Sequence, residues 1–211
     1  MAQKTIYLIR HGETDYNRRG VVQGSGVDSD LNEMGQAQAT AFFQAYQHVP
    51  FSKIYISVLK RTYQTARLFI ELGIPYEKLT GLNEISWGIM EGKVPGNLDN
   101  EYYRGLIEAW SSGNTALPTD GGESPEQVEA RQRVAIRIIL SHPDETPVLI
   151  AMHGRAMRIL LCWATNRPLA QMDHFEHSNL CLYKLLYDYD TQTFEIELAN
   201  DTAHLLSLAL A

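Results

Sequence analysis

The chain has 211 residues, of which 45% are hydrophobic and 20% are charged, a composition typical of globular proteins with a substantial core. Its formal net charge of −7 argues against sequence-independent nucleic-acid binding, because such binding needs a basic face that displaces counterions from phosphates. A small anionic ligand is not excluded, since a local cluster of arginines can be positive on an acidic protein.

The cysteines and the apolar runs restrict the protein class further. Cys162 and Cys181 stand in apolar surroundings without a metal-type spacing, so we expect reduced core thiols. No signal-peptide pattern opens the chain, and no apolar run approaches the roughly 18 residues that a membrane span needs. We expect a cytoplasmic protein with no nucleic-acid or membrane partner, built as one domain over residues 1–211 and present as a monomer or homodimer.

The first predicted strand ends in polar residues that suit a ligand site. Residues 6–9 are apolar and β-branched or aromatic, and Arg10, His11 and Gly12 follow at once. The glycine lets the backbone turn and approach a ligand closely, and the carboxyl end of a strand is where open α/β sheets bind ligands. Taken alone, the tripeptide is equally compatible with a solvated arginine and a capping histidine.

The next elements place a second arginine at a helix start. A long polar loop at 13–30 precedes a helix for which Asn32 is the predicted N-cap. A strand is predicted at 53–57 and a helix at 59–72, with Arg61 in the first helical turn. The helix dipole disfavours a cation there, so an anion bound beside it would account for this placement.

The middle of the chain predicts a third strand and an insertion. Residues 75–82 form the strand candidate, and Glu84 stands at its end as a candidate carboxylate. Residues 85–122 contain several spaced glycines and aromatic residues. We interpret this stretch as a largely helical flap inserted over the C-terminal edge of the sheet.

The last third repeats the pattern of the first strand. A helix begins after the N-cap Ser124 and ends at Pro143. The strand at 147–152 is apolar on both faces and ends in His153 and Gly154, before a helix at 155–164. Strands at 180–187 and 194–198 predict an edge hairpin, and the apolar tail at 204–211 is suited to docking. Alternating strands and helices predict a three-layer αβα fold with a mostly parallel central sheet.

Parallel strands deliver the polar groups at their ends to one edge of a sheet. Arg10, His11, Arg61, Glu84 and His153 therefore form one candidate site. Two arginines offer planar donor forks to a phosphate, a neutral imidazole is a competent nucleophile, and a second, protonated imidazole would add positive charge. This set supplies positioning and electrostatic stabilisation for phosphoryl transfer without a metal, and no spacing of metal ligands is present.

Several stretches match one family in the right order. They are Ile9-Arg10-His11-Gly12-Glu13-Thr14 with Asn17, Gln23-Gly24, Leu31-Asn32-Glu33-Met34-Gly35-Gln36-Ala37, the run from Ser57 to Ala66, and Met152-His153-Gly154. Together they resemble the signature of the histidine phosphatase superfamily, the phosphoglycerate-mutase-like fold, over residues 6 to about 187.

The resemblance implies a metal-independent phosphomonoesterase without a cofactor, acting on a small phosphoester. His11 would become phosphohistidine, Arg10, Arg61 and His153 would surround the phosphoryl group with support from Asn17, and Glu84 would be the proton donor and then the base. Gln23, Gly24, Gly154 and Arg155 complete the candidate binding residues. Arg155 stands where a small residue is usual, so we expect a third cation that contacts a second anionic group on the substrate. The other histidines, together with Lys60, Arg67, Arg158 and the flap aromatics, are interpreted as ordinary structural or solvated residues.

Two other functions stay open. Cofactor-dependent mutases of the family carry Glu-Arg-His-Tyr-Gly where this chain has Glu84-Ile85-Ser86-Trp87-Gly88, and Glu91-Gly92 resembles the phosphatase branch. A phosphatase is therefore favoured, with a phosphoglycerate mutase as the alternative. A catalytically idle phospho-ligand-binding module would usually lack one of the site residues, all of which are present here.

Overall fold

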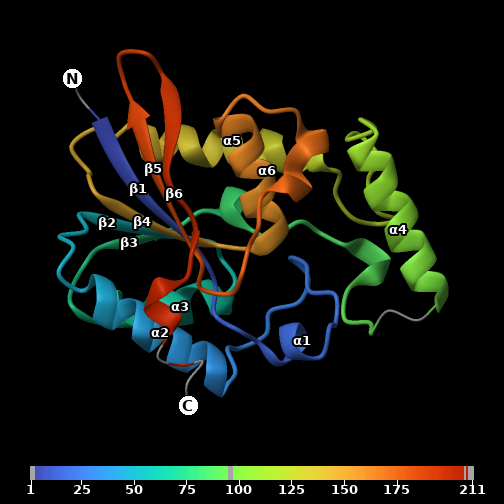
Figure 1. The fold of residues 1–211 in the computed structure, drawn as a ribbon, viewed down its shortest axis with the longest axis horizontal. Coiled ribbons are helices and arrows are strands. Elements are labelled where there is room, and N and C mark those ends of the chain that lie inside the picture. Colours follow the sequence, from blue (N-terminus) through green and yellow to red (C-terminus); the bar gives the residue numbers. More distant parts are fainter. Residues whose placement is uncertain (1–2, 95–96, 207, 209–211) are drawn as a thin grey trace.

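The fold is built on one six-stranded sheet with helices on both faces (Figure 1). The structure is a computed structural model that describes residues 3–94, 97–206 and 208. The strands are β1 (Gln3–Arg10), β2 (Lys53–Ile56), β3 (Tyr76–Lys78), β4 (Val148–Met152), β5 (Leu182–Asp188) and β6 (Thr193–Asp201), in the order β3-β2-β4-β1-β5-β6. The first four in this order are parallel, and β5 and β6 run antiparallel at one edge. The predicted three-layer, mostly parallel fold and its edge hairpin are confirmed.

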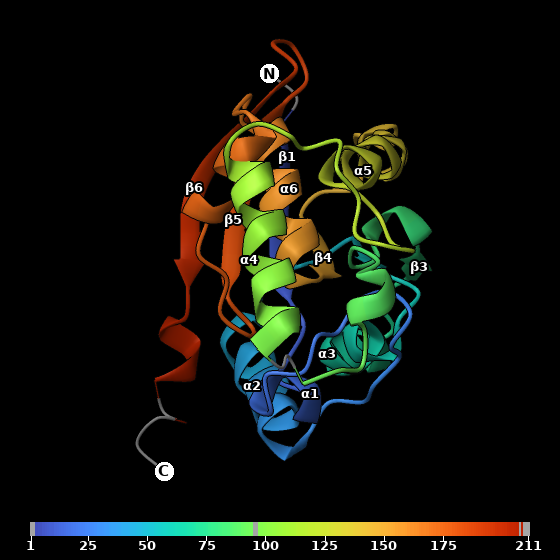
Figure 2. The same ribbon diagram turned by 90° about the vertical axis from the view of Figure 1, so that its right-hand side faces the viewer.

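Helices cover the two faces of the sheet in pairs. The α-helices are α1 (Asp15–Arg18), α2 (Glu33–Tyr46), α3 (Lys60–Glu71), α4 (Asn97–Ser111), α5 (Pro125–Leu140) and α6 (Gly154–Ala164), and the 3₁₀ turns are η1 (Thr80–Leu82), η2 (Gly88–Met90), η3 (Leu169–His174) and η4 (Ala203–Leu205). One core cluster joins α2 and α3 to the sheet, and the other joins α5 and α6 to the opposite face. Figures 1 and 2 show α4 away from the centre of the sheet, on the same side as α6, where it contacts η3.

Local sequence accounts for the elements that carry the site. In β1, Ile6 and Leu8 pack into the core on the α5–α6 side, whereas Ile9 packs on the α2–α3 side, because successive side chains of a strand alternate between faces. The Asn32 side chain accepts a hydrogen bond from the backbone N–H of Gly35 and so caps α2. The predicted caps and the two buried strands are thus confirmed.

The third predicted strand is wrong in its length. Pairing with β2 ends at Lys78, and the chain then enters the 3₁₀ turn η1. Gly81 of this turn packs so closely on α5 that an added Cβ would lie 2.5 Å from the carbonyl oxygen of Arg131. Glu84 therefore follows a 3₁₀ turn and not a strand end. The helix predicted to end at Pro143 also ends earlier, at Leu140.

The flap contains less helix than expected, and the tail docks in part. Only α4 and η2 give regular structure between residues 85 and 122, within the described residues. In the tail, the His204 ring contacts Phe42 and Tyr46 of α2 edge-on; residues 207 and 209–211 lie outside the described residues. Both cysteines are buried and free. None of the helices in the described ranges has the length and apolar character to cross a membrane, and the single domain over residues 1–211 stays a prediction.

Candidate active site

Parallel pairing of β1 with β4 brings the two predicted histidines together. Arg10 lies opposite Met152 in the register, so His11 and His153 leave adjacent strand ends side by side. The N–H of His11 donates to the carbonyl of Met152 at 3.0 Å, and the two imidazole centroids are 5.2 Å apart. The expected meeting of these side chains at the carboxyl edge is confirmed.

The His11 ring is oriented with one nitrogen left free. Its Nδ1 lies 2.7 Å from the carbonyl oxygen of Gly12, which requires the proton on Nδ1 and leaves a lone pair on Nε2. Burial, together with Arg61 and Arg10, holds the pKa of His11 well below its usual range. The ring is thus a neutral imidazole with an available nucleophilic nitrogen. The amide of Asn179, a residue that the sequence did not single out, donates to the His11 carbonyl at 3.0 Å.

The loop that follows His11 rests directly on the start of α2. A Cβ on Gly12 would lie 2.6 Å from the Gly35 carbonyl oxygen, and a Cβ on Gly35 would lie 2.1 Å from the Glu13 carbonyl oxygen. Only glycine at both positions permits this backbone contact. The α2 N-terminus therefore fixes the path of the chain just after the candidate nucleophile.

Gly35→Ala is expected to destabilise the protein by about 1–3 kcal/mol, because the new methyl group forces two backbones apart, and to lower activity by displacing the His11 loop. Gly105→Ala is the matched control: Gly105 lies in α4 with open space around the added Cβ, so its alanine should stabilise the helix by roughly 0.5–1 kcal/mol. Urea unfolding of both variants measures the difference. A Gly35→Ala protein as stable as the parent would contradict the close contact.

His153 is held between an arginine and a serine. Arg61 Nε donates to His153 Nδ1 at 3.1 Å, and His153 Nε2 lies 2.8 Å from Ser57 Oγ. Nδ1 is then the acceptor, so the proton sits on Nε2 and the ring is neutral. Burial and Arg61 hold the pKa of His153 well below its usual range. The expectation of a protonated second imidazole is therefore wrong for this structure, because a buried ring beside guanidinium groups disfavours a further positive charge.

Arg61 links the start of α3 to the polar loop. Its Nη1 donates to the Val27 carbonyl at 2.7 Å and its Nη2 to the Gly24 carbonyl at 3.2 Å. In the amide orientation that satisfies its neighbours, Gln23 accepts from Arg61 Nε and Nη1, each at 3.2 Å, and donates to Thr14 Oγ1 at 2.8 Å. The loop that carries Gln23 and Gly24 is therefore positioned by the predicted phosphate-binding arginine.

One N–H group of Arg10 has no hydrogen-bond partner among the described residues. Its Nη1 donates to the His177 carbonyl at 2.9 Å, whereas its buried Nε finds no hydrogen-bond partner among the described residues. A buried polar group without a partner costs roughly 1–3 kcal/mol. An anionic oxygen beside Arg10 would relieve that cost.

Asn17 stabilises the loop that follows His11. It forms a reciprocal capping box with Thr14 at the start of α1, and its Oδ1 accepts from the Asn179 amide at 3.2 Å. Through Asn179, Asn17 is connected to the backbone of His11. It does not line the cavity described below, so its contribution here is to hold the loop.

Glu84 sits at the N-terminus of α6. Its Oε1 accepts from the N–H groups of Ile85 and Ala156 at 3.0 and 2.8 Å, and its Oε2 accepts from the N–H of Arg155 at 3.1 Å. Helix N-termini attract carboxylates because their first N–H groups lack partners within the helix. This cradle brings Glu84 to the site even though it does not follow a strand.

A cavity of about 360 Å³ opens at this edge of the sheet. Its lining is Arg10, Gly20, Val22, Gln23, Glu84, Trp87, Asn100, Tyr103, Gly154, Arg155, Arg158 and His177. Of the residues that the sequence predicts for the site, Arg10, Gln23, Glu84, Gly154 and Arg155 line this cavity. His11, Arg61 and His153 are nearly fully buried and do not line the cavity in this structure.

The outer wall contains residues that the sequence interpretation missed. Arg158 and His177 were interpreted as ordinary, and both line the cavity. Arg155 Nη1 and Arg158 Nη1 share Asp173 Oδ1 at 2.7 and 2.5 Å. The Arg155 guanidinium also lies 5.8 Å from the centre of the Trp87 ring. No local motif marks these residues, because α6, the flap and the segment before β5 meet only in the fold.

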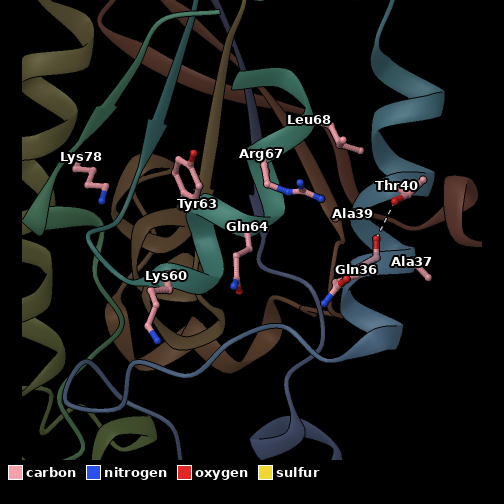
Figure 3. A pocket seen from close by; sticks show the side chains of 10 residues that line it. All are labelled: Gln36, Ala37, Ala39, Thr40, Lys60, Tyr63, Gln64, Arg67, Leu68 and Lys78. Carbon is pink, nitrogen blue, oxygen red and sulfur yellow. Dashed lines mark hydrogen bonds between the residues drawn. The ribbon is translucent and has the colours of Figure 1, made fainter. Parts of the chain in front are cut away.

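A second cavity of about 560 Å³ lies between α2 and α3 (Figure 3). It is lined by Gln36, Ala37, Ala39, Thr40, Lys60, Tyr63, Gln64, Arg67, Leu68 and Lys78. None of the candidate catalytic residues is among them. Figure 3 shows Lys78 and Tyr63 on one side of α3 and Arg67 directed toward α2 on the other, so the basic groups do not converge.

Known proteins with the same sequence pattern include phosphatases and mutases. A model of the histidine phosphatase superfamily (branch 1) matches residues 6–202. The adenosylcobalamin/alpha-ribazole phosphatase of Salmonella typhimurium is 30% identical over 180 residues, which cover 83% of this chain and 87% of that protein. The probable phosphoglycerate mutase GpmB of Erwinia tasmaniensis is 27% identical over 212 residues, covering 97% and 96% of the two chains.

A solved structure agrees in fold. A mycobacterial glucosyl-3-phosphoglycerate phosphatase is 26% identical to this chain, with a TM-score of 0.81 over 95% of this chain and 100% of that one. The similarity therefore covers the sheet, its helices and the flap together.

Proposed function

The chain belongs to the histidine phosphatase superfamily, and we propose that it is a cytoplasmic phosphomonoester hydrolase that acts on a small phosphorylated metabolite. The observation that carries this proposal is the His11 ring, whose Nδ1 is committed to the Gly12 carbonyl while Nε2 keeps its lone pair. A neutral imidazole held in this way, next to buried arginines, is suited to attack a phosphorus atom.

In the first proposed step, His11 Nε2 bonds to phosphorus while the ester P–O bond breaks. The leaving oxygen takes a proton from Glu84, which must therefore enter this step protonated. Arg10 and Arg61 stabilise the negative charge on the phosphoryl oxygens. The buried Nε of Arg10, which lacks a partner among the described residues, supports this role.

In the second step, Glu84 takes a proton from water, and the water oxygen bonds to phosphorus. The P–N bond breaks, its electron pair returns to Nε2, and inorganic phosphate leaves. For phosphate to reach His11 and Arg61, the Gln23 amide must move, because its oxygen accepts from Arg61 in this structure. We assign Gln23 to the substrate side of the site for this reason.

A phosphatase is favoured over a mutase by the residue after Glu84. Ile85 is fully buried in the core, so it cannot take the place of the substrate-holding arginine that the mutase pattern carries there. Glu91, the residue that resembles the phosphatase branch, accepts from the Trp87 N–H at 2.8 Å. The mutase stays the second candidate, because the GpmB-named relative matches almost the whole chain.

Phosphate release from p-nitrophenyl phosphate in excess EDTA tests the proposal. Among the described residues, no group of three or more His, Cys, Asp and Glu side chains could hold a metal ion, and we predict turnover that survives chelation. EDTA-sensitive activity would contradict the metal-independent chemistry. Absence of turnover, with interconversion of phosphoglycerates, would favour the mutase, and tight phosphate binding without either reaction would favour the idle binding module.

Ser57→Ala is expected to lower kcat roughly fivefold, because His153 loses the partner of its Nε2 and a buried hydrogen bond is worth about 1 kcal/mol. Steady-state kinetics with p-nitrophenyl phosphate measure the effect, and Ser112→Ala, at an exposed serine after α4, is the control. Equal kcat in the two variants would show that Ser57 does not position the ring.

Arg155→Ala is expected to raise KM more for bis-anionic than for mono-anionic phosphoesters, by roughly tenfold, if Arg155 contacts a second anionic group. The pairing of Arg155 with Asp173 means that such a group must share or displace this carboxylate. The comparison of Michaelis constants across the two substrate classes tests the prediction. Equal changes in KM for the two substrate classes would mean that Arg155 contributes only to the structure of the cavity wall.

A further inference from the structure

The cavity wall is rich in guanidinium donors. Arg10, Arg155 and Arg158 all line it, and a guanidinium group can only donate hydrogen bonds. The Glu84 carboxylate also lines the wall, but its two oxygens already accept three backbone hydrogen bonds. A substrate hydroxyl that enters this cavity as a donor therefore cannot bind to the arginines and has to find one of the other side chains, Gln23, Asn100, Tyr103 or His177.

Among these four residues, His177 is the one whose backbone carbonyl accepts a hydrogen bond from Arg10. It lies between η3 and β5, and its ring lines the cavity. No hydrogen bond joins either of its ring nitrogens to another described residue. The imidazole therefore faces the cavity with its hydrogen-bonding capacity unused.

The position of the ring is fixed by its neighbours on two sides. Its backbone carbonyl accepts from Arg10 Nη1 at 2.9 Å. A Cβ on Gly154 would lie 2.5 Å from the His177 Cδ2 and 2.8 Å from its Nε2. Because Gly154 has no side chain, the ring can rest on the first residue of α6, directly beside the phosphate-binding arginine.

The surroundings keep this ring neutral. Burial and the positive charges of Arg10, Arg158 and Arg155 lower the pKa of His177 to about 3. A neutral imidazole has one N–H donor and one lone-pair acceptor. Among the three arginines, it supplies the acceptor that they cannot.

We propose that His177 determines leaving-group specificity by accepting a hydrogen bond from a substrate hydroxyl, which selects phosphomonoesters of polyhydroxy alcohols, such as sugar or polyol phosphates. The proposal rests on the proposed phosphatase function and names the substrate class for that same site. Negatively charged groups of the leaving group would go to the arginines, whereas a hydroxyl donor would go to His177.

The test compares glycerol 3-phosphate with n-propyl phosphate, which differ only in the hydroxyl groups of the leaving alcohol. We expect the parent protein to prefer glycerol 3-phosphate in kcat/KM by roughly tenfold, as for one well-placed hydrogen bond. His177→Phe should abolish this preference by lowering kcat/KM for glycerol 3-phosphate alone, with n-propyl phosphate within about twofold of the parent. His177→Gln, which keeps an acceptor, should restore part of the preference.

The controls separate this proposal from a structural role and from the function itself. His48→Phe, at an exposed histidine outside the cavity lining, should leave both substrates unchanged. An equal loss for both substrates in His177→Phe, or a parent protein without preference, would overturn the proposal. If His177→Phe fails to fold, an unaltered preference in His177→Ala, whose side chain has no acceptor, would overturn it equally. Absence of turnover with p-nitrophenyl phosphate in the parent would instead contradict the phosphatase function.

Discussion

His11→Ala is expected to lower kcat/KM for p-nitrophenyl phosphate by roughly 10⁴-fold or more, because removal of a covalent nucleophile leaves only binding and electrostatic stabilisation. The fold should tolerate the change. The neighbouring strands β1 and β4 stay paired, and the hydrogen bond that the ring itself makes goes only to the adjacent Gly12 carbonyl. Steady-state kinetics together with the thermal unfolding midpoint measure the two effects separately.

The covalent intermediate gives an independent readout. Brief reaction with a ³²P-labelled phosphoester followed by alkaline denaturation should leave label on the parent protein, and that label should be lost in acid, as expected for a phosphorus–nitrogen bond. His11→Ala should retain none, and His48→Ala, at an exposed histidine, should behave as the parent. Residual turnover within tenfold of the parent would show that another group attacks the phosphorus.

The predictable part of this site lies on paired strand ends. Arg10, His11 and His153 could be placed from the sequence because buried parallel strands carry periodic apolar patterns, and the register of β1 and β4 then sets their side chains next to one another. The sequence also pointed to Arg61, since a cation in the first turn of α3 conflicts with the helix dipole.

The remaining part depends on contacts that local patterns do not contain. Glu84 reaches the site because the first N–H groups of α6 bind its carboxylate, and no strand pattern foretells that contact. His177 enters the cavity because β5 runs antiparallel to β1 and brings the preceding segment to the same edge. The neutral state of His153 follows from its burial and from Arg61, neither of which can be judged before the fold is known.

Glu84→Gln is expected to lower kcat for alkyl phosphates such as glycerol 3-phosphate by roughly 10²–10⁴-fold, the usual contribution of a general acid. The alkoxide leaving group needs a proton, whereas p-nitrophenolate leaves without one. With p-nitrophenyl phosphate, the first step should therefore stay fast while hydrolysis of the phosphohistidine slows, because Glu84 also activates the water. A burst of p-nitrophenol followed by a slow steady state would reveal both roles in one stopped-flow trace.

The structure supplies the control for this experiment. Glutamine can keep the two hydrogen bonds that Oε1 accepts from Ile85 and Ala156. It loses the negative charge at the N-terminus of α6 and places an NH2 group against the Arg155 N–H that Oε2 accepts from, so we expect a loss of about 1–3 kcal/mol in stability. Glu126→Gln removes a carboxylate from the first turn of α5 and controls for the lost charge at a helix N-terminus, without affecting either step. Equal slowing of the first step for the alkyl and nitrophenyl esters would mean that Glu84 positions α6 and does not donate the proton. Proton donation predicts an effect that rises with the basicity of the leaving oxygen, and a purely structural role predicts none.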